Sequence, residues 1–162
     1  MLIIHDLTPE EAGKIDFGEN RVIFDNGKIR PCIGCFGCWL KTPGKCVLRD
    51  GYEAMGKAFS ECDRLVIISK CTYGSYSPFV KNVLDRSIGY ISPFFEIRNG
   101  EMHHRQRYPK TLALKAVFYG EDLTIQEKDT AREWVAAMAD NLYCEVQQVT
   151  FCITPEEAGG FL

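Results

Sequence analysis

Stretches of apolar, partly β-branched residues alternate along this chain with stretches of helical periodicity, and this alternation constrains the fold more than any other feature. Five stretches have the composition of buried strands: residues 1–5, 21–24, 64–69, 112–119 and 144–151. The helix signals between and after them are a capped start at Thr8, a helical face over 51–61, a helix from Pro78 to about 88, and a capping box at Thr124. Strands that alternate with helices form a parallel sheet with helices on both faces. The sequence therefore predicts an α/β fold, a three-layer doubly wound parallel sheet of five strands.

Length and composition indicate one globular domain over residues 1–162. The chain is 46% hydrophobic and 12% aromatic, which is enough to bury a substantial core. Its formal net charge of -3 gives no reason to expect nucleic acid as a partner. The first residues lack the pattern of an export signal, and no apolar stretch approaches the roughly eighteen residues of a membrane-spanning helix. We therefore expect a cytoplasmic protein without membrane contact, whose eight cysteines are reduced.

The most informative motif is a run of cysteines after the second predicted strand. Four thiols lie within fifteen residues: Cys32, Cys35, Cys38 and Cys46. Gly34 and Gly37 lie between the first three, so the backbone can curl and point three sulfurs into one space. A turn at Pro43-Gly44 can bring the fourth cysteine back to them. This spacing predicts a metal centre, and a 4Fe-4S cluster suits it, because such a cluster can take three ligands from one loop and a fourth from further away.

Zinc and disulfide bonds are alternatives to a cluster for the cysteine run. Four thiolates also make a tetrahedral zinc site, although zinc sites more often use two separated Cys-x2-Cys pairs than one continuous run of three. Disulfide bonds, or reduced cysteines packed as small hydrophobic side chains, do not explain the even spacing. The gap of seven residues before Cys46 is longer than the last gap of the bacterial ferredoxin motif. We therefore rank an iron–sulfur cluster above zinc, in a fold other than that of a ferredoxin.

Two segments of the chain carry a resemblance to a known family. They are Pro31-Cys32-Ile33-Gly34-Cys35 with Cys38-Trp39 and Gly44-Lys45-Cys46-Val47-Leu48-Arg49-Asp50, and then Tyr73-Gly74-Ser75-Tyr76-Ser77-Pro78-Phe79 onward to Arg86. Over roughly residues 20 to 120 the chain resembles iron-sulfur flavoproteins, which belong to the NADPH-dependent FMN reductase-like family of the flavodoxin-like superfamily. The resemblance implies a flavodoxin-like fold, FMN and a 4Fe-4S cluster as cofactors, NAD(P)H and a redox protein as partners, and a homo-oligomer.

The resemblance places the flavin ring at the loop after the third predicted strand. In open α/β sheets ligands lie beyond the carboxyl ends of the strands. The residues there are Thr72, Tyr73, Gly74, Ser75 and Tyr76. In the family this loop contacts the isoalloxazine through aromatic and backbone groups, often in a Pro-Val-Tyr setting from which this chain departs. Ser77 and Pro78 also have the pattern of a helix N-cap and first turn, whatever the loop binds.

The flavin phosphate has a less favourable site. In flavodoxin-like proteins it is held by the loop after the first strand and by the following helix N-terminus. Here that loop is His5-Asp6-Leu7, and Glu10 and Glu11 follow in the first helical turn. Carboxylates at a helix N-terminus repel a phosphate. We therefore expect FMN to bind weakly, or its site to be completed by Arg105 or Arg107 of another chain.

Residues from about 90 to 110 form a predicted irregular insertion. Residues 90–95 are partly aromatic and too apolar to be left in water, which favours a homo-oligomer. Residues 103–107 are basic and can attract an anionic nucleotide or substrate, or can be a solvated loop with subunit contacts. The two adjacent histidines, His103 and His104, are not expected to face one metal ion.

Together these features predict an electron-transfer oxidoreductase that resembles NAD(P)H-dependent FMN reductases and iron-sulfur flavoproteins. Electrons would pass between the flavin and the four-cysteine cluster, so that no general acid, base or nucleophile is required of the protein. The alternative is a non-catalytic flavodoxin-like subunit, or a zinc-stabilised binding module, that has lost the flavin phosphate site.

Overall fold

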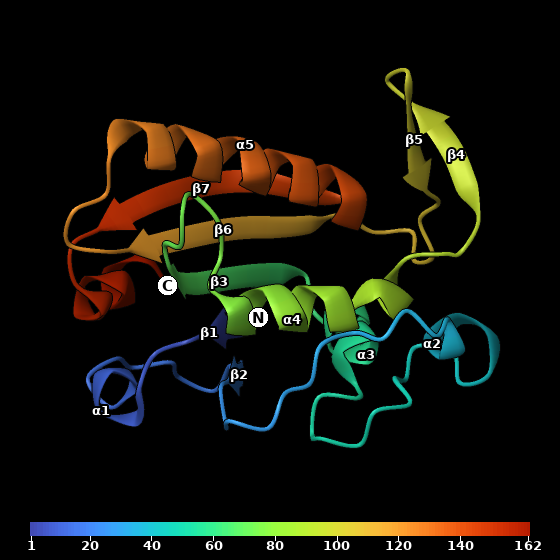
Figure 1. Cartoon of the computed structure of the whole chain (residues 1–162), viewed down its shortest axis with the longest axis horizontal. Coiled ribbons are helices and arrows are strands. Elements are labelled where there is room, and N and C mark those ends of the chain that lie inside the picture. Colours follow the sequence, from blue (N-terminus) through green and yellow to red (C-terminus); the bar gives the residue numbers. More distant parts are fainter.

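The computed structural model describes residues 1–162 and has a five-stranded sheet with helices on both faces (Figure 1). The strands are β1 (Leu2–His5), β2 (Arg21–Phe24), β3 (Arg64–Lys70), β6 (Leu112–Tyr119) and β7 (Cys144–Cys152). Neighbouring strands are all parallel, and their spatial order is β2-β1-β3-β6-β7. This is the order of a doubly wound flavodoxin-like sheet, so the predicted α/β fold is confirmed.

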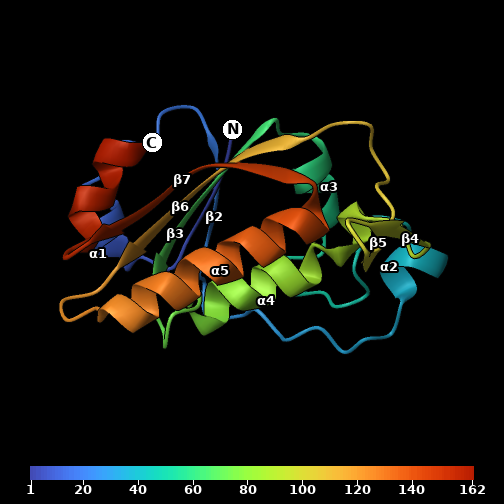
Figure 2. The same cartoon turned by 90° about the horizontal axis from the view of Figure 1, so that it is seen from above.

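The helices vary widely in length. They are α1 (Pro9–Ala12), α2 (Gly37–Leu40), α3 (Met55–Ser60), α4 (Pro78–Arg86) and α5 (Ile125–Leu142), with two 3-10 helices, η1 (Ile88–Tyr90) and η2 (Pro155–Phe161). Figure 2 shows α4 and α5 side by side along one face of the sheet. None of the helices combines the length and the apolar character that crossing a membrane requires.

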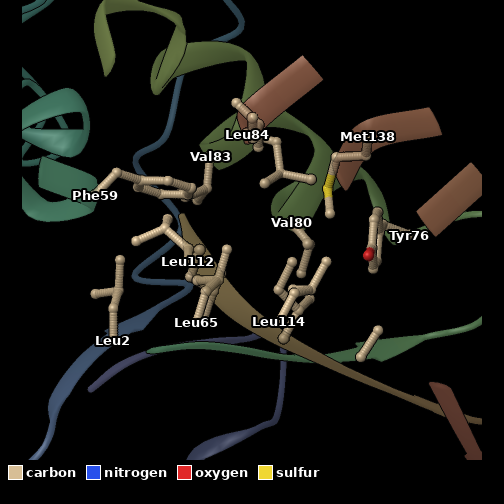
Figure 3. Packing of buried hydrophobic residues seen from close by; sticks show 14 of the residues in the cluster. Leu2, Phe59, Leu65, Tyr76, Val80, Val83, Leu84, Leu112, Leu114 and Met138 are labelled. Atoms are coloured by element: carbon tan, nitrogen blue, oxygen red, sulfur yellow. The ribbon is translucent and has the colours of Figure 1, made fainter. Parts of the chain in front are cut away.

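The two faces of the sheet bury different side chains. Along β3, Leu65 and Ile67 belong to the core on one face, and Val66 and Ile68 belong to the core on the other. All four are buried, as expected for parallel strands that are covered on both sides. The larger core packs under α3, α4 and α5 and is shown in Figure 3. The smaller core receives its cover from the region of α1 and η2.

Local capping interactions decide where three of the helices begin. Thr8 and Thr124 each form a capping box, in which the threonine side chain accepts from the third helical N–H and a glutamate accepts from the threonine N–H. The Ser77 side chain accepts from the N–H of Val80 at the start of α4. These caps lie where the sequence predicts them. They depend on residues three positions apart, which is why sequence alone identifies them.

Helix α3 begins later than predicted, at Met55 instead of residue 51. Gly51 has a φ of +94°, which no helix accommodates. The Asp50 carboxylate accepts from the N–H of Tyr52 at 3.2 Å and so holds a turn before the helix. The expectation of a helix over 51–61 is therefore corrected to the shorter range.

The predicted irregular insertion contains an antiparallel hairpin of β4 (Phe95–Arg98) and β5 (Glu101–His104). Asn99 and Gly100 connect the strands with φ values of 51° and 85°. A two-residue turn of this kind needs positive φ at both positions, which Asn-Gly supplies. The expectation of irregular structure was wrong, because Asn99-Gly100 favours a tight turn that pairs the two flanking segments as strands. Figure 1 shows the hairpin projecting from the body of the molecule above α2.

Gly74 fixes the loop after β3 against α5. A Cβ at this position would lie 2.7 Å from the Thr130 Cβ and 2.9 Å from the Glu127 carbonyl oxygen, and the residue has a φ of +75°. We expect Gly74→Ala to lower the free energy of unfolding by about 1–3 kcal/mol more than a matched alanine that meets no neighbour. Gly100→Ala is that control, since its φ is +85° and nothing lies within 4 Å of the added Cβ. Equal losses for both variants in urea denaturation would show that Gly74 is needed for backbone conformation alone.

His5 ends β1 as a buried and uncharged side chain. It is 3% exposed, and its ring stacks on Phe17 with the ring centroids 5.0 Å apart. Its Nδ1 accepts from the Leu7 N–H at 3.2 Å, which places the ring proton on Nε2. Burial lowers the pKa of His5 to about 4. The folded protein therefore binds a proton at His5 less readily than the unfolded chain does.

This difference predicts a pH dependence of stability. Between about pH 6.5 and pH 4 the unfolded chain holds the extra proton, so stability is lost as the pH falls through this window. The loss attributable to His5 is about 3 kcal/mol. Urea denaturation across this range should show it as the difference between wild type and His5→Gln, a comparison that cancels the carboxylates common to both proteins. Parallel pH profiles for the two proteins would contradict the assignment.

Candidate metal centre and flavin loop

The four predicted cysteine ligands line one cavity. It has a volume of about 250 Å³, and its walls include Cys32, Cys35, Cys38 and Cys46 together with the apolar side chains Ile33, Phe36, Trp39 and Ile88. Cys32 and Cys35 are exposed, Cys38 and Cys46 are half-buried, and all four are free thiols. No disulfide bond joins any of these cysteines in this structure. The segment that carries them leaves the edge strand β2 and passes α4 on its way to α3 (Figure 1).

Backbone geometry curls the first three cysteines around the cavity. Gly34 has a φ of +63° and Phe36 one of +56°, and α2 begins directly after this left-handed turn. A Cβ on Gly37 would lie 2.8 Å from Val47 Cγ1 and 3.4 Å from the Cys35 sulfur. A residue without a side chain is needed here, because the two ends of the loop approach each other at this point.

A close contact between glycines returns Cys46 to the other three. The Gly44 N–H donates to the Cys38 carbonyl at 2.9 Å, as expected for the predicted turn at Pro43-Gly44. A Cβ on Gly56 of α3 would lie 3.2 Å from the Gly44 carbonyl oxygen, and one on Gly89 of η1 would lie 3.3 Å from the Gly44 Cα. The turn therefore packs directly on the backbone of both helices. This contact joins the cysteine loop to the core.

A buried arginine, which the sequence reasoning missed, ties both ends of the cysteine segment to α4. The Arg86 side chain is 0% exposed, and its Nη1 donates to the Arg30 carbonyl and to Asp50, both at 2.8 Å. Its Nη2 donates to the other Asp50 oxygen at 2.9 Å and to the Leu48 carbonyl at 3.4 Å. The pKa of Asp50 is lowered to about 2, mainly by the hydrogen bonds from Arg86. The sequence did carry a signal that Arg86 is buried, because its spacing places it on the same helical face as Phe79 and Val83.

The thiols influence one another in the way expected of a shared site. The pKa of Cys38 is raised, first by burial and then by the charges of Cys46, Cys32 and Cys35. Four thiolates in one cavity therefore repel each other, and a bound cationic centre would relieve that repulsion. As placed, no three of the side chains converge closely enough to form a ready site for a single metal ion. The donor set fits a polynuclear centre that fills the cavity, because such a centre presents a separate metal to each sulfur.

The predicted flavin loop is divided between surface and core. Thr72 and Ser75 close a turn through paired backbone hydrogen bonds of 2.9 Å, and Tyr73 at its tip is 89% exposed. Gly74 packs against α5. Tyr76 is 3% exposed and lies in the core (Figure 3). Its ring stacks on that of Phe118, with the centroids 5.0 Å apart. Of the five predicted residues, the structure therefore offers Thr72, Tyr73 and Ser75 to a ligand and uses the other two to hold the loop in place.

A carboxylate occupies the carboxyl end of β1, where the phosphate of a flavin nucleotide would be expected. Asp6 accepts two hydrogen bonds from the Lys70 N–H, at 2.9 and 3.2 Å, and one from the Tyr119 hydroxyl at 3.1 Å. Burial raises the pKa of Asp6 despite these bonds. The sequence pattern indicated Glu10 and Glu11 as the competing carboxylates, whereas the structure places Asp6 at the sheet edge, through contacts with residues far along the chain.

Helix α1 leaves few donors for a phosphate, because Pro9 has no N–H and the capping box uses the N–H groups of Thr8 and Glu11. The Thr8 N–H donates to the Glu11 side chain at 2.7 Å, and the Glu11 N–H donates back to the Thr8 hydroxyl at 3.3 Å. The helix is four residues long and carries two glutamates in that turn. This chain alone therefore does not fit the phosphate of FMN.

The basic segment of the hairpin is not a uniform cationic surface. The His104 ring lies between Trp39 and Phe95, with centroid distances of 5.0 and 4.5 Å. His103 instead lies 3.2 Å from the Asn141 side chain, and Arg105 lies 3.7 Å from Glu96. Adjacent strand residues point to opposite faces, so the two histidines are kept apart, in line with the expectation that they do not share a metal.

Known proteins resemble this chain in two ways. No family model matches it. It is 35% identical over 60 residues to an iron-sulfur flavoprotein of Methanocaldococcus jannaschii, which is 37% of this chain and 30% of the relative. It is 28% identical over 85 residues to an iron-sulfur flavoprotein of Archaeoglobus fulgidus, which is 52% of this chain and 38% of the relative. The matched segments thus span about a third of the length of these curated relatives.

Solved structures extend the likeness to nearly the whole fold. Azoreductase AzrA superposes with a TM-score of 0.54 at 11% identity, covering 96% of this chain and 87% of the azoreductase chain. At that identity the comparison shows the fold alone. The chain therefore has a flavodoxin-like fold, and part of its sequence is similar to the iron-sulfur flavoproteins.

Proposed function

We propose that this protein is an electron-transfer oxidoreductase in which Cys32, Cys35, Cys38 and Cys46 hold a 4Fe-4S cluster. The observation that carries the proposal is that all four thiols line one cavity of about 250 Å³. The similarity to proteins named iron-sulfur flavoproteins supports it. A cluster bound there supplies one-electron transfer, and the protein sets its potential and its distance from partners.

The residues around the cavity have identifiable tasks in this function. Ile33, Phe36 and Ile88 limit access of water, which affects both the potential and the lifetime of a cluster. The Trp39 indole N–H donates to the Ile91 carbonyl at 2.9 Å and so fixes the ring as a wall. No side chain near the cavity needs to act as an acid, a base or a nucleophile, and we assign no catalytic residue in that sense.

Zinc is the competing occupant of the cysteine cavity. A structural zinc ion needs four sulfurs at about 2.3 Å from one point. The four cysteines here line one cavity, and no three of them converge closely enough to hold a single ion. This difference favours the cluster, and metal uptake decides between them.

The first test is reconstitution of the purified protein with iron and sulfide without oxygen. We expect roughly four iron and four sulfide per chain, with broad visible absorption, and we expect Cys35→Ala to abolish stable uptake. Cys62→Ala is the matched control, because Cys62 is a free thiol buried in the core, away from the cavity. Uptake of zinc but not of iron and sulfide by the wild type would leave the zinc-stabilised module as the better description.

A flavin is the second cofactor in this proposal, and this chain supplies only part of its site. The exposed Tyr73 ring, with Thr72 and Ser75 beside it, suits an isoalloxazine ring. Helix α4 begins next to this loop and ends at Arg86, so one helix of about 14 Å separates the flavin loop from the cysteine segment. We propose that NAD(P)H supplies the electrons and that a redox protein receives them.

Self-association would complete what a single chain lacks. Large apolar side chains are exposed on the cysteine loop and on the hairpin: Ile33, Phe36, Leu40, Phe94, Phe95, Ile97 and Met102. Surfaces of this character are commonly covered by a partner. We propose that a second copy covers them and that its Arg105 or Arg107 contributes positive charge to the flavin phosphate. The alternative is that no second copy supplies this charge and that the protein is a flavodoxin-like subunit without its own flavin. Asp6, at the position expected for the phosphate, favours this alternative.

The flavin test compares FMN with riboflavin. We expect the isolated chain to bind FMN no more than about tenfold more tightly than riboflavin, because no helix N-terminus repays the charge of the phosphate. Asp6→Asn should improve FMN binding and leave riboflavin binding unchanged. Asp122→Asn, which removes an exposed carboxylate after β6, controls for net charge. Fluorescence titration showing submicromolar FMN binding, much tighter than riboflavin, would prove that an intact phosphate site exists.

A further inference from the structure

Arg86 has one hydrogen-bond donor that the protein does not use. Its guanidinium has five N–H groups. Four of them reach Asp50, the Arg30 carbonyl and the Leu48 carbonyl. The fifth, Nε–H, is buried without a partner. An unpaired buried donor costs about 1–3 kcal/mol, so a fully buried arginine is expected to have a partner in the functional state.

Cys46 is the group placed to be that partner, because it is the one thiol close enough to act directly on the Arg86 guanidinium. It lies two residues from Leu48 and four from Asp50, both of which the guanidinium holds. Burial by itself lowers the pKa of Arg86. The interactions of the guanidinium with Asp50 and with Cys46 outweigh the effect of burial, so the pKa is raised. A neutral thiol is a weak acceptor, whereas a thiolate accepts a charge-assisted hydrogen bond. Metal ligation converts the thiol into a thiolate.

We propose that Arg86 donates its Nε–H to the Cys46 thiolate of the bound cluster and thereby raises the reduction potential of that cluster. This inference rests on the proposed function. Reduction adds one electron and one negative charge to the cluster, and a buried cationic donor stabilises that charge. Arg86 does not bind the metal, so it is a positioning residue that acts through Cys46.

Asp50 limits and directs this effect. Its carboxylate is 4% exposed, takes both Nη groups and offsets most of the guanidinium charge. It also orients the guanidinium, because both carboxylate oxygens are held, one by the Arg30 N–H at 3.1 Å and one by the Tyr52 N–H. The Nε edge is thereby left facing away from Asp50. The hydrogen bond to sulfur, together with the remaining charge, then sets the potential.

The chain contains a matched control for Arg86. Arg30 is also an arginine beside Asp50, with its Nε 3.8 Å from the same carboxylate, but it is 56% exposed. Water and salt screen an exposed charge strongly and a buried one weakly. Arg30→Gln and Arg86→Gln therefore remove the same charge from the same neighbourhood and differ in burial and in the contact with Cys46.

Redox titration of the reconstituted proteins tests the proposal. We expect Arg86→Gln to shift the midpoint potential downward by at least a tenfold change in the one-electron equilibrium, which is about 59 mV. Arg86→Lys should lie between it and wild type, since it keeps the charge but lacks the Nε–H. Arg30→Gln should shift the potential by less than that amount. No shift in Arg86→Gln, or equal shifts in Arg86→Gln and Arg30→Gln, would overturn the proposal.

A measurement on wild-type protein covers the case in which the Arg86 variants do not fold. Nitrogen-15 NMR can follow the arginine Nε–H groups as iron and sulfide are loaded. The Arg86 signal should be broadened or shifted strongly by the paramagnetic cluster, and that of Arg132 on α5 should not. An unaffected Arg86 signal in loaded protein overturns the inference while the proposed function stands. Wild type that takes up no cluster overturns both.

Discussion

The buried ion pair between Arg86 and Asp50 is the interaction on which the candidate site depends. It fastens the segment before Cys32 and the segment after Cys46 to the end of α4, so a long loop with little secondary structure acquires a defined shape. Removing one partner of such a pair leaves an uncompensated buried charge, which typically costs about 3–5 kcal/mol. The same pair supports α3, because Asp50 also holds the turn that precedes it. Loop shape and sheet packing are therefore coupled through one guanidinium.

The carboxyl edge of the sheet shows the opposite situation, in which the protein satisfies its own polar groups and leaves little for a ligand. Asp6 accepts from the backbone of β3 and from Tyr119 of β6, and so joins three strands at the position where flavodoxin-like proteins receive a ligand. The capping box of α1 is likewise closed on itself. One end of α4 thus lies beside the cavity of the thiols and carries a buried unpaired donor, and the other end lies beside a loop whose exposed ring is Tyr73. This asymmetry is why the cysteines, and not the flavin phosphate site, carry the functional argument.

The hairpin and the cysteine loop form one further unit. His104 of β5 lies against Trp39 of the cysteine loop, so the inserted strands support the wall of the cavity that the four cysteines line. The face of the hairpin that carries His104 also carries exposed apolar side chains, among them Phe95 and Met102. The insertion both supports a cavity wall and exposes apolar surface, so in the proposed homo-oligomer a second chain that covers the hairpin would also rest against the cavity.

The sequence alone determined the strands, the capped helix starts and the grouping of four thiols. Each of these depends on residues a few positions apart, such as Thr124 with Glu127 or the repeat of cysteines at every third position, and short-range hydrogen bonds and side-chain periodicity act in the same way in any context. The hairpin turn at Asn99-Gly100 is also a local feature that the sequence determines.

Only the tertiary structure decided the rest. Arg86 meets Asp50 across 36 positions, and Asp6 meets Tyr119 across 113. Whether Tyr76 faces a ligand or the core is settled by β6 and α5, which lie far along the chain. Arginine and aspartate are usually exposed and mobile, and burial is what holds their side chains in one position with defined partners. Whether a residue is buried depends on the packing of the whole sheet and its helices.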